Sequence, residues 1–273
     1  MSSRFFLLFG LASLLLVVIE SHSGDHHHID FSYLGWNGPQ KWGSLSPNYA
    51  ECAKGKAQSP INIITKEVIK NNKLKPLVRH YHSTNATLIN NGFNIGMKYN
   101  HDVGVVSIDG KNHTLLQMHW HTPSEHRIDD QQFPAELHLV HMSDQGELAV
   151  VAILFKYGNS DPLLSKLKLE LEEIKKEKEE KEEEGWVSIE KVNINKYLYL
   201  MRRKKMMMYL RYMGSLTTPP CSENVVWNIL TKVMSISKEQ VDLLHAPLDS
   251  AYKSNCRPPQ PLNGRIVQLY NNS

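Results

Sequence analysis

The sequence predicts a mainly β (α+β) fold, built on one large, mostly antiparallel twisted sheet with short helices at its periphery. Segments rich in β-branched and apolar residues recur along the chain, at 87–89, 103–108, 115–121, 137–141 and 148–155. Asn-Asn-Gly, Asp-Gly and Gln-Gly signals separate them, as tight turns separate the strands of a β-meander. Helical pattern is confined to shorter pieces, such as 237–244.

The composition is that of a globular chain. Of its 273 residues, 41% are hydrophobic, which is too many for a disordered protein. Three cysteines cannot hold together a fold of this size, so a hydrophobic core must do so. The net charge of +3 gives no reason to expect nucleic acid as a partner. No internal repeat or glycine-serine linker divides the chain, and we expect a single domain at 24–273.

The first residues have the pattern of a secretory signal peptide. Arg4 precedes an apolar run at 5–19, and small residues follow at 21–23. This run is short for a membrane span, so we expect cleavage near Ser23 rather than an uncleaved anchor, and no transmembrane segment after cleavage. The predicted location is therefore the secretory pathway and the extracellular space. Asn85 and Asn112 begin Asn-x-Thr tripeptides, the acceptor pattern for glycosylation in that pathway.

The cysteines fit the same compartment. Cys52 and Cys221 can pair in an oxidising environment, which would leave Cys256 unpaired. Sequence spacing alone does not choose the pair.

One segment departs from the rest in charge. Residues 170–184 hold nine glutamates and four lysines, and Arg202 to Lys205 and Met206 to Met208 follow. We expect a solvated charged helix or a disordered insertion, followed by a basic surface strand. A specific ionic partner is the alternative.

The histidine spacing points to a metal site. His119 and His121 lie two residues apart in a predicted strand, so both project to the same face together with Gln117. His138 shares a strand face with Glu136 in the same way. If the two strands are neighbours, three neutral imidazoles converge, and three nitrogen ligands with an open fourth position describe a catalytic zinc site.

Gln117 and Glu136 are placed to accept the second ring N–H of a ligating histidine. The run His26 to His28 lacks such a scaffold and is interpreted as a solvated tail. The remaining histidines receive a structural or surface interpretation: His80, His82, His101, His113, His126, His141 and His245.

Several motifs in this order resemble the alpha-class carbonic anhydrases, and most closely the plant members. They spread over nearly the whole mature chain, at 37–39 (NGP), 58–61 (QSPI), 117–126 (QMHWHTPSEH), 135–141 (AELHLVH), 214–221 (GSLTTPPC), Trp227 and 257–265 (RPPQPLNGR). The resemblance implies a zinc lyase that interconverts carbon dioxide and bicarbonate. It also implies that His119, His121 and His138 bind Zn²⁺.

The resemblance assigns further roles around the metal. Gln117 would orient His119, and Glu136 would orient His138. Thr217 would accept a hydrogen bond from zinc-bound hydroxide and donate its own proton to Glu125, because an ionised carboxylate can only accept. The backbone of Thr218 would contact bicarbonate. The carbon dioxide pocket would be apolar, although core packing explains its residues equally well: Val140, Val150, Leu216, Val225 and Trp227.

The sequence differs from the family pattern at two places. Fast members carry a proton-shuttle histidine directly after the Asn-Asn-Gly turn, where this chain has Phe93, which cannot titrate. We therefore expect a slower, buffer-dependent enzyme. The stretch around 165–212 is longer and more charged than in relatives.

The plant members also imply a disulfide between Cys52 and Cys221, which would leave Cys256 free.

Two other functions compete with the enzyme. One is a storage or binding protein on the same scaffold, like the dioscorins of yam tubers. The other is a zinc esterase using the same site. Some plant relatives imply the chloroplast stroma, reached through the secretory route, as an alternative location. No feature of the sequence sets the oligomeric state.

Overall fold

The computed structural model describes residues 31–99, 101–181, 185–192 and 208–271. The predicted signal peptide at 1–23, the histidine run at 26–28 and the basic segment at 202–205 lie outside the described residues, as do Met206 and Met207. The described residues belong to one compact unit.

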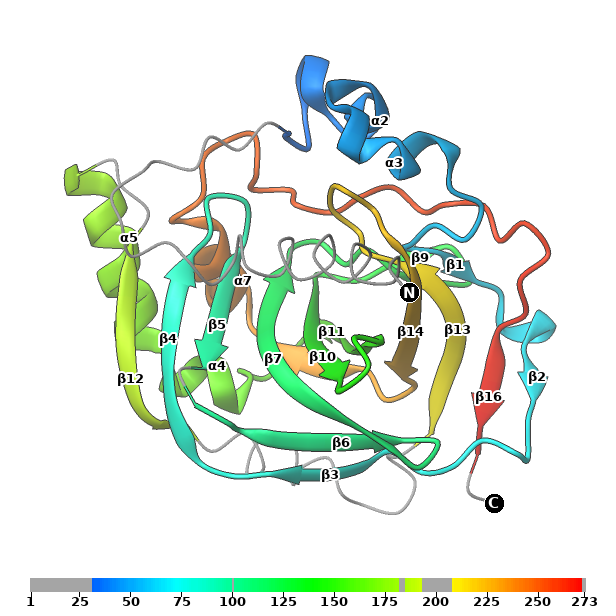
Figure 1. Ribbon diagram of the computed structural model, residues 1–273. Coiled ribbons are helices and arrows are strands. Elements are labelled where there is room, and N and C mark those ends of the chain that lie inside the picture. Colours follow the sequence, from blue (N-terminus) through cyan, green and yellow to red (C-terminus); the bar gives the residue numbers. More distant parts are fainter. Residues whose placement is uncertain (1–30, 100, 182–184, 193–207, 272–273) are drawn as a thin grey trace, which may run out of the picture. The chain divides into compact units, whose positions relative to one another are not determined.

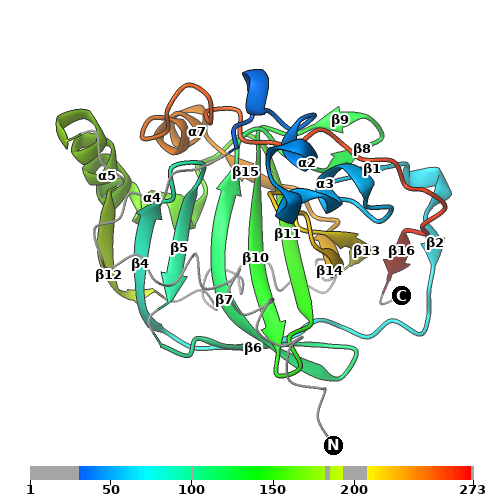
Figure 2. The same cartoon turned by 45° about the horizontal axis from the view of Figure 1, so that its top comes forward.

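A large twisted sheet organises this unit (Figure 1; Figure 2), and thirteen strands belong to it within the described ranges. Its main path runs in the order β12 (Trp186–Val192), β4 (Thr84–Asn90), β5 (Ile95–Tyr99), β7 (Lys111–His121), β10 (Ala135–Ser143), β11 (Leu148–Tyr157), β14 (Glu223–Leu230), β13 (Tyr209–Ser215), β16 (Gln268–Tyr270) and β2 (Ile69–Lys70). Off this path lie β3 (Val78–Tyr81), β6 (Gly104–Ile108) and β15 (Met234–Ile236). A smaller sheet contains β1 (Asn62–Ile63), β8 (Arg127–Ile128) and β9 (Gln131–Gln132).

The predicted fold class is confirmed, with one refinement of the pairing. Strands β4, β5, β7, β10 and β11 pair antiparallel, as the turn signals predict. The sheet is mixed, however, because β11 pairs with β14 and β15, and β16 with β2, in parallel. Parallel neighbours need a longer connection. For β11 and β14, the connection includes the helical residues 162–166 and 168–181.

The helices are short and lie around the sheet (Figure 2). They are α2 (Trp42–Leu45), α3 (Glu51–Lys54), α4 (Pro162–Lys166), α5 (Lys168–Lys181) and α7 (Lys238–His245), with 3₁₀ turns η1 (Gly35–Asn37), η2 (Pro47–Tyr49) and η3 (Thr65–Glu67). Helix α7 begins at a capping box, in which Ser237 and Gln240 satisfy each other's backbone N–H. Within the described part of the chain, no helix is long and apolar enough to cross a membrane.

The charged segment forms helix α5, and this helix is not wholly solvated. Leu171 and Ile174 are fully buried in the hydrophobic core. Charged residues on the outer side of the helix form pairs at i,i+4 spacing, such as Lys175 with Glu179 at 3.7 Å. Exposed pairs of this kind stabilise a protein by at most about 1 kcal/mol, so the two buried apolar side chains anchor the helix.

The pairing of β7 with β10 separates two faces of the sheet. His119 lies opposite His138, and Trp120 lies opposite Leu137. Since side chains alternate along a strand, the histidines share one face, while Trp120 and Leu137 enter the core on the other. The same alternation that builds the core therefore delivers the histidines to a common place.

The disulfide between Cys52 and Cys221 is confirmed, with Cα atoms 5.0 Å apart. It joins α3 to the loop that follows β13. Cys256 is a free, partly buried thiol. Asn85 and Asn112 are exposed on β4 and β7, so their predicted glycosylation is sterically open and stays a prediction.

A buried histidine makes the fold sensitive to acid. His141 on β10 faces the core, and its Nε2 lies 2.7 Å from the Tyr81 hydroxyl oxygen. Burial lowers the pKa of His141 to about 3. An unfolded chain would protonate the same imidazole at about pH 6.5. Protonation therefore favours unfolding at any pH between these two values.

We predict that the free energy of unfolding of the metal-free protein falls as the pH drops below about 6.5, with His141 contributing a slope of about 1.4 kcal/mol per pH unit. The contribution is unchanged above that pH. Urea unfolding across pH 4 to 8, with a chelator present, measures the slope. The substitution His141→Asn should make it shallower, whereas His101→Asn at an exposed position should not. An unchanged slope in His141→Asn would contradict the assignment.

Candidate metal centre and active site

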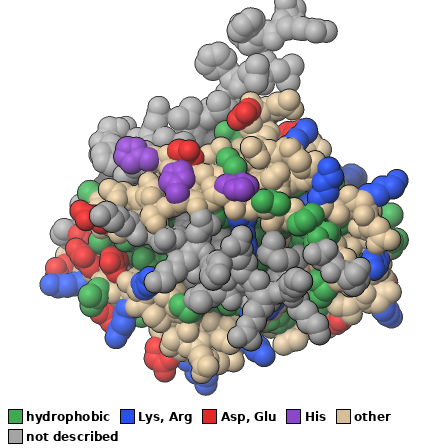
Figure 3. All heavy atoms as spheres, turned by 90° about the horizontal axis from the view of Figure 1, so that it is seen from below, with side chains coloured by type: hydrophobic (Ala, Val, Ile, Leu, Met, Phe, Trp, Pro, Cys, Tyr) green, Lys and Arg blue, Asp and Glu red, His purple; other side chains and the backbone are tan. Residues whose placement is uncertain are grey.

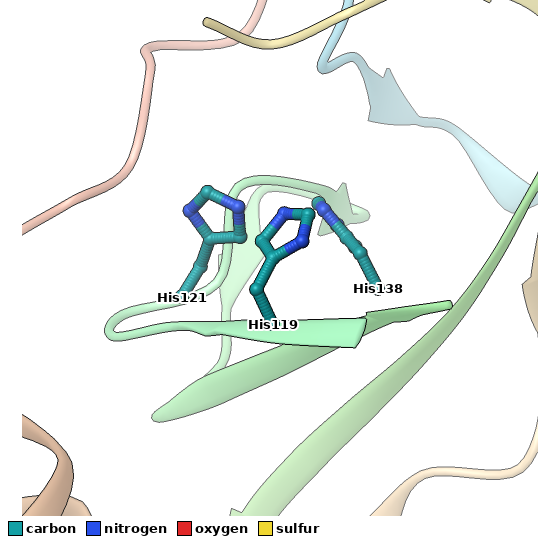
Figure 4. Close-up of side chains that lie close together, drawn as sticks. All are labelled: His119, His121 and His138. Atoms are coloured by element: carbon teal, nitrogen blue, oxygen red, sulfur yellow. The ribbon is translucent and has the colours of Figure 1, made fainter. Parts of the chain in front are cut away.

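Three histidines from adjacent strands converge on one point (Figure 4). His119 and His121 come from β7 and His138 from β10, and one ring nitrogen of each lies within 4.8 Å of the others. The ring centroids are 4.7 to 5.2 Å apart. β7 and β10 are adjacent strands, as predicted, and their pairing brings the three imidazoles together.

The imidazoles are held neutral by their surroundings. Burial lowers the pKa of His119 well below its ordinary value and lowers that of His121 to about 4. Burial also lowers the pKa of His138, although Glu136 opposes this. A neutral imidazole is the form that binds metal, so the site is ready for a cation at neutral pH.

The second ring nitrogen of each histidine has a hydrogen-bond acceptor. His119 donates through Nδ1 to Oε1 of Gln117 at 2.8 Å, and His138 through Nε2 to Oε1 of Glu136 at 2.8 Å. His121 donates through Nδ1 to the carbonyl oxygen of Asn255 at 2.5 Å. These acceptors fix each ring and leave the opposite nitrogen free for a metal.

Asn255 is a site residue that the sequence analysis missed. Its side chain also accepts a hydrogen bond from the Thr122 backbone and donates to the carbonyl oxygens of Phe93 and Trp120. Asn255 lies 134 positions from His121, and an asparagine between Ser254 and Cys256 carries no local signal of such a role. Only the tertiary fold could reveal it.

Glu136 is the centre of the buried polar network. Its Oε1 accepts from His138 and from Nδ1 of His126 at 2.7 Å, and its Oε2 accepts from the backbone N–H groups of Glu125 and His126. Burial alone would raise the pKa of Glu136, but the two histidines hold it well below the ordinary value. The carboxylate therefore stays ionised without exposure to water.

His126 is a second missed residue, since the sequence analysis gave it only a structural interpretation. Its Nε2 lies 2.7 Å from the hydroxyl of Tyr212, which contacts Oγ of Ser59 at 2.8 Å. Ser59 and Ser215 then bond to each other through side chain and backbone. This chain of hydrogen bonds connects the metal centre to the start of the loop that carries Thr217.

Glu125 lies beside the three histidines. Its Oε2 is 3.5 Å from Nε2 of His121, and its Oε1 accepts a hydrogen bond from the backbone N–H of Arg257 at 2.9 Å. Burial raises the pKa of Glu125 to about 7, while His138 and the Thr217 hydroxyl act to lower it. A bound dication would lower this pKa further, because positive charge favours the carboxylate.

The donor set fits a metal ion. Among the described residues, Nε2 of His121 is a buried ring nitrogen without a hydrogen-bond partner, and it faces the other two imidazoles. A buried polar atom in that condition requires an explanation, and a bound metal ion would supply one. Three neutral nitrogen donors with an acidic group nearby suit zinc and leave room for a further ligand.

The apolar residues of the predicted pocket form a row across three strands. Val140, Val150 and Trp227 pair in register on β10, β11 and β14. The Trp227 ring lies 4.8 Å from that of His138. Val225 is buried two residues before Trp227, and Leu216 directly precedes Thr217. The carbonyl oxygen of Thr218 accepts a hydrogen bond from the backbone N–H of Cys221, within the same loop.

Phe93 is partly exposed, and its ring packs against Phe31 with centroids 5.3 Å apart. Its carbonyl oxygen accepts the hydrogen bond from Asn255 described above. The turn that carries Phe93 is thus tied to the residue that orients His121. Its side chain offers no group that can carry a proton.

Comparisons with known proteins agree on one family. The family described as "Eukaryotic-type carbonic anhydrase" matches residues 37–271. Alpha carbonic anhydrase 7 of Arabidopsis thaliana is 38% identical over 93% of this chain and 91% of its own length. Dioscorin DB3L of Dioscorea polystachya is 36% identical over 98% and 96%.

Solved structures agree. The crystal structure of dioscorin complexed with ascorbate is 35% identical and superposes with a TM-score of 0.81, over 89% of this chain and 98% of that one. The complex of the alpha-carbonic anhydrase of Thermovibrio ammonificans with the inhibitor sulfanilamide is also 35% identical, with a TM-score of 0.74 over 87% and 98%.

We predict that Gln117→Leu lowers the affinity for zinc by about 10- to 100-fold, because the His119 ring loses the acceptor that fixes its orientation. Competition with a fluorescent chelator measures the affinity. Gln131→Leu makes the same chemical change at an exposed residue and should leave the affinity unchanged. Equal affinities in both variants would show that Gln117 does not support the metal.

Proposed function

This chain belongs to the eukaryotic-type carbonic anhydrase family, and on that premise we propose that it is a zinc lyase hydrating carbon dioxide reversibly to bicarbonate and a proton. The convergence of His119, His121 and His138, with each second nitrogen bonded, carries the proposal. Zinc supplies a nucleophile at neutral pH by lowering the pKa of water from about 15.7 to about 7, as is established for carbonic anhydrases themselves.

Thr217 and Glu125 orient the attacking oxygen in this proposal. The ionised Glu125 can only accept, so the Thr217 hydroxyl donates to it. The oxygen of Thr217 then has a lone pair left to accept a hydrogen bond from the nucleophile. Arg257 supports the arrangement, because its backbone N–H already holds the other carboxylate oxygen of Glu125.

The apolar row receives the substrate. Carbon dioxide carries no net charge, so Val140, Val150 and Trp227 can hold it close to the nucleophile without desolvating an ion. Leu216 and Val225 extend this surface, and the backbone of Thr218 contacts the bicarbonate product. The reaction then needs positioning rather than a covalent intermediate.

A storage or binding function is the second candidate, because a dioscorin is 36% identical to this chain and a dioscorin structure superposes on it with a TM-score of 0.81. The complete histidine set, Glu125 and Thr217 favour the enzyme. A zinc esterase would use the same nucleophile on a larger substrate, and esters offered as substrates test it. Metal analysis and a hydration assay separate storage from catalysis.

The disulfide supports a secretory route, since such bonds persist in oxidising compartments. We propose cleavage of residues 1–23 and delivery to the extracellular space or apoplast. The chloroplast stroma, reached through the same route, is the alternative. Fractionation of the expressing tissue distinguishes the two locations.

We predict that the purified protein contains zinc and hydrates carbon dioxide, and that His119→Ala loses both. Thr217→Val should retain zinc while its hydration rate falls by about 10- to 100-fold, because only the orienting hydroxyl is removed. Stopped-flow indicator assays and metal analysis measure these quantities. Zinc-free native protein, or hydration that survives His119→Ala, would reject the proposed site.

We predict that turnover depends on buffer, because Phe93 cannot relay the proton released at each cycle. Release to bulk water from a group with a pKa near 7 limits turnover to about 10³ s⁻¹, given recombination at no more than about 10¹⁰ M⁻¹s⁻¹. Imidazole should therefore raise the turnover of the native protein and raise that of Phe93→His less. If turnover of the native protein is already fast, and neither imidazole nor Phe93→His raises it, another residue must carry the proton.

A further inference from the structure

A second His-x-His pair lies on β3, outside the metal centre. His80 and His82 flank Tyr81, which is 3% exposed and directs its hydroxyl to the buried His141. The backbone N–H of His82 donates to the carbonyl oxygen of Val103, so the extended pairing continues one residue beyond β3. Because strand side chains alternate, His80 and His82 project together to the opposite side, and both are exposed.

This spacing is the one that the chain uses at the metal centre. His119 and His121 are also two residues apart on a strand, and their ring centroids lie 5.0 Å apart. Two imidazoles at this spacing lie on one strand face, and rotation of their exposed side chains can bring both to a single ion. Within the described ranges β3 pairs with β6 alone, and the exposure of His80 and His82 shows that their face of the strand is open.

The His82 ring has the second contact that is typical of a ligating histidine. Its Nε2 lies 2.7 Å from the carbonyl oxygen of Asp102 and donates to it, which leaves Nδ1 free. His121 is held in the same manner by the carbonyl oxygen of Asn255. An acceptor behind the ring fixes its orientation and raises its basicity toward a metal.

A third histidine belongs to the same neighbourhood. His101 directly precedes Asp102 and is exposed. His80, His82 and His101 are the exposed histidines of the described chain, and three histidines gather beside an acidic group on the face shown in Figure 3.

We propose that His80 and His82 form a solvent-exposed site for a divalent transition metal ion. Among these ions, the site binds Cu²⁺ most tightly. Imidazole ligands suit copper, and Cu²⁺ exceeds the other first-row divalent ions in affinity for a given nitrogen site. Water completes the coordination of an ion held by these two imidazoles. The site is independent of the proposed catalysis, because it shares no residue with the metal centre.

The test titrates Cu²⁺ into zinc-loaded protein and follows it by calorimetry and electron paramagnetic resonance. The variants are His82→Asn and the double substitution Val78→His with His82→Asn. Val78 is 44% exposed on the same strand face, two residues before His80, so the double variant restores the spacing with a different partner. His26 to His28 are present in every protein, and any copper that they bind cancels in the comparison.

His82→Asn should lose one bound copper or bind it at least about tenfold more weakly, because one imidazole cannot chelate. The double variant should recover the binding, and hydration activity should be unchanged in both. Copper binding that is equal in the native protein and His82→Asn would overturn the site. Failure of the double variant to recover binding, with native circular dichroism, would overturn the chelation by spaced histidines.

Discussion

The register between β7 and β10 sets the arrangement of the whole site. It places His119 opposite His138 and Glu136 opposite His121, so three imidazoles and their carboxylate belong to one sheet face. A shift of one residue would send those polar groups into the core and bring Trp120 and Leu137 out of it. The hydrophobic core therefore selects the same register that the metal centre requires, and stability and function are set by one pairing.

The polar groups that this register buries are satisfied by a network centred on Glu136. Four donors on one carboxylate offset its desolvation, which is the condition under which a buried charge is tolerated. The buried Arg257 is also satisfied by hydrogen bonds. Its guanidinium donates to Gln58, Ser59 and the carbonyl oxygen of Cys52. Gln58 in turn donates to Cys221, so the disulfide and the Thr217 loop belong to the same framework.

The sequence was sufficient where the signal is local. Alternation predicts that His119 and His121 share a face, and the turn signals predict the antiparallel strands around them. It was insufficient where a contact joins distant parts of the chain, as between His121 and Asn255 or between His126 and Tyr212. The same limit explains why the burial of one side of α5 was not predicted. Glutamate and lysine dominate this segment, and only contacts with distant parts of the chain bury Leu171 and Ile174 in the core.

In the proposed site, three histidine nitrogens hold one zinc ion at this register. X-ray absorption spectroscopy of the zinc-loaded protein counts and identifies these ligands. We expect three imidazole nitrogens and one further light atom, at about 2.0 to 2.1 Å from zinc. A sulfur ligand, or fewer than three imidazoles, would contradict it.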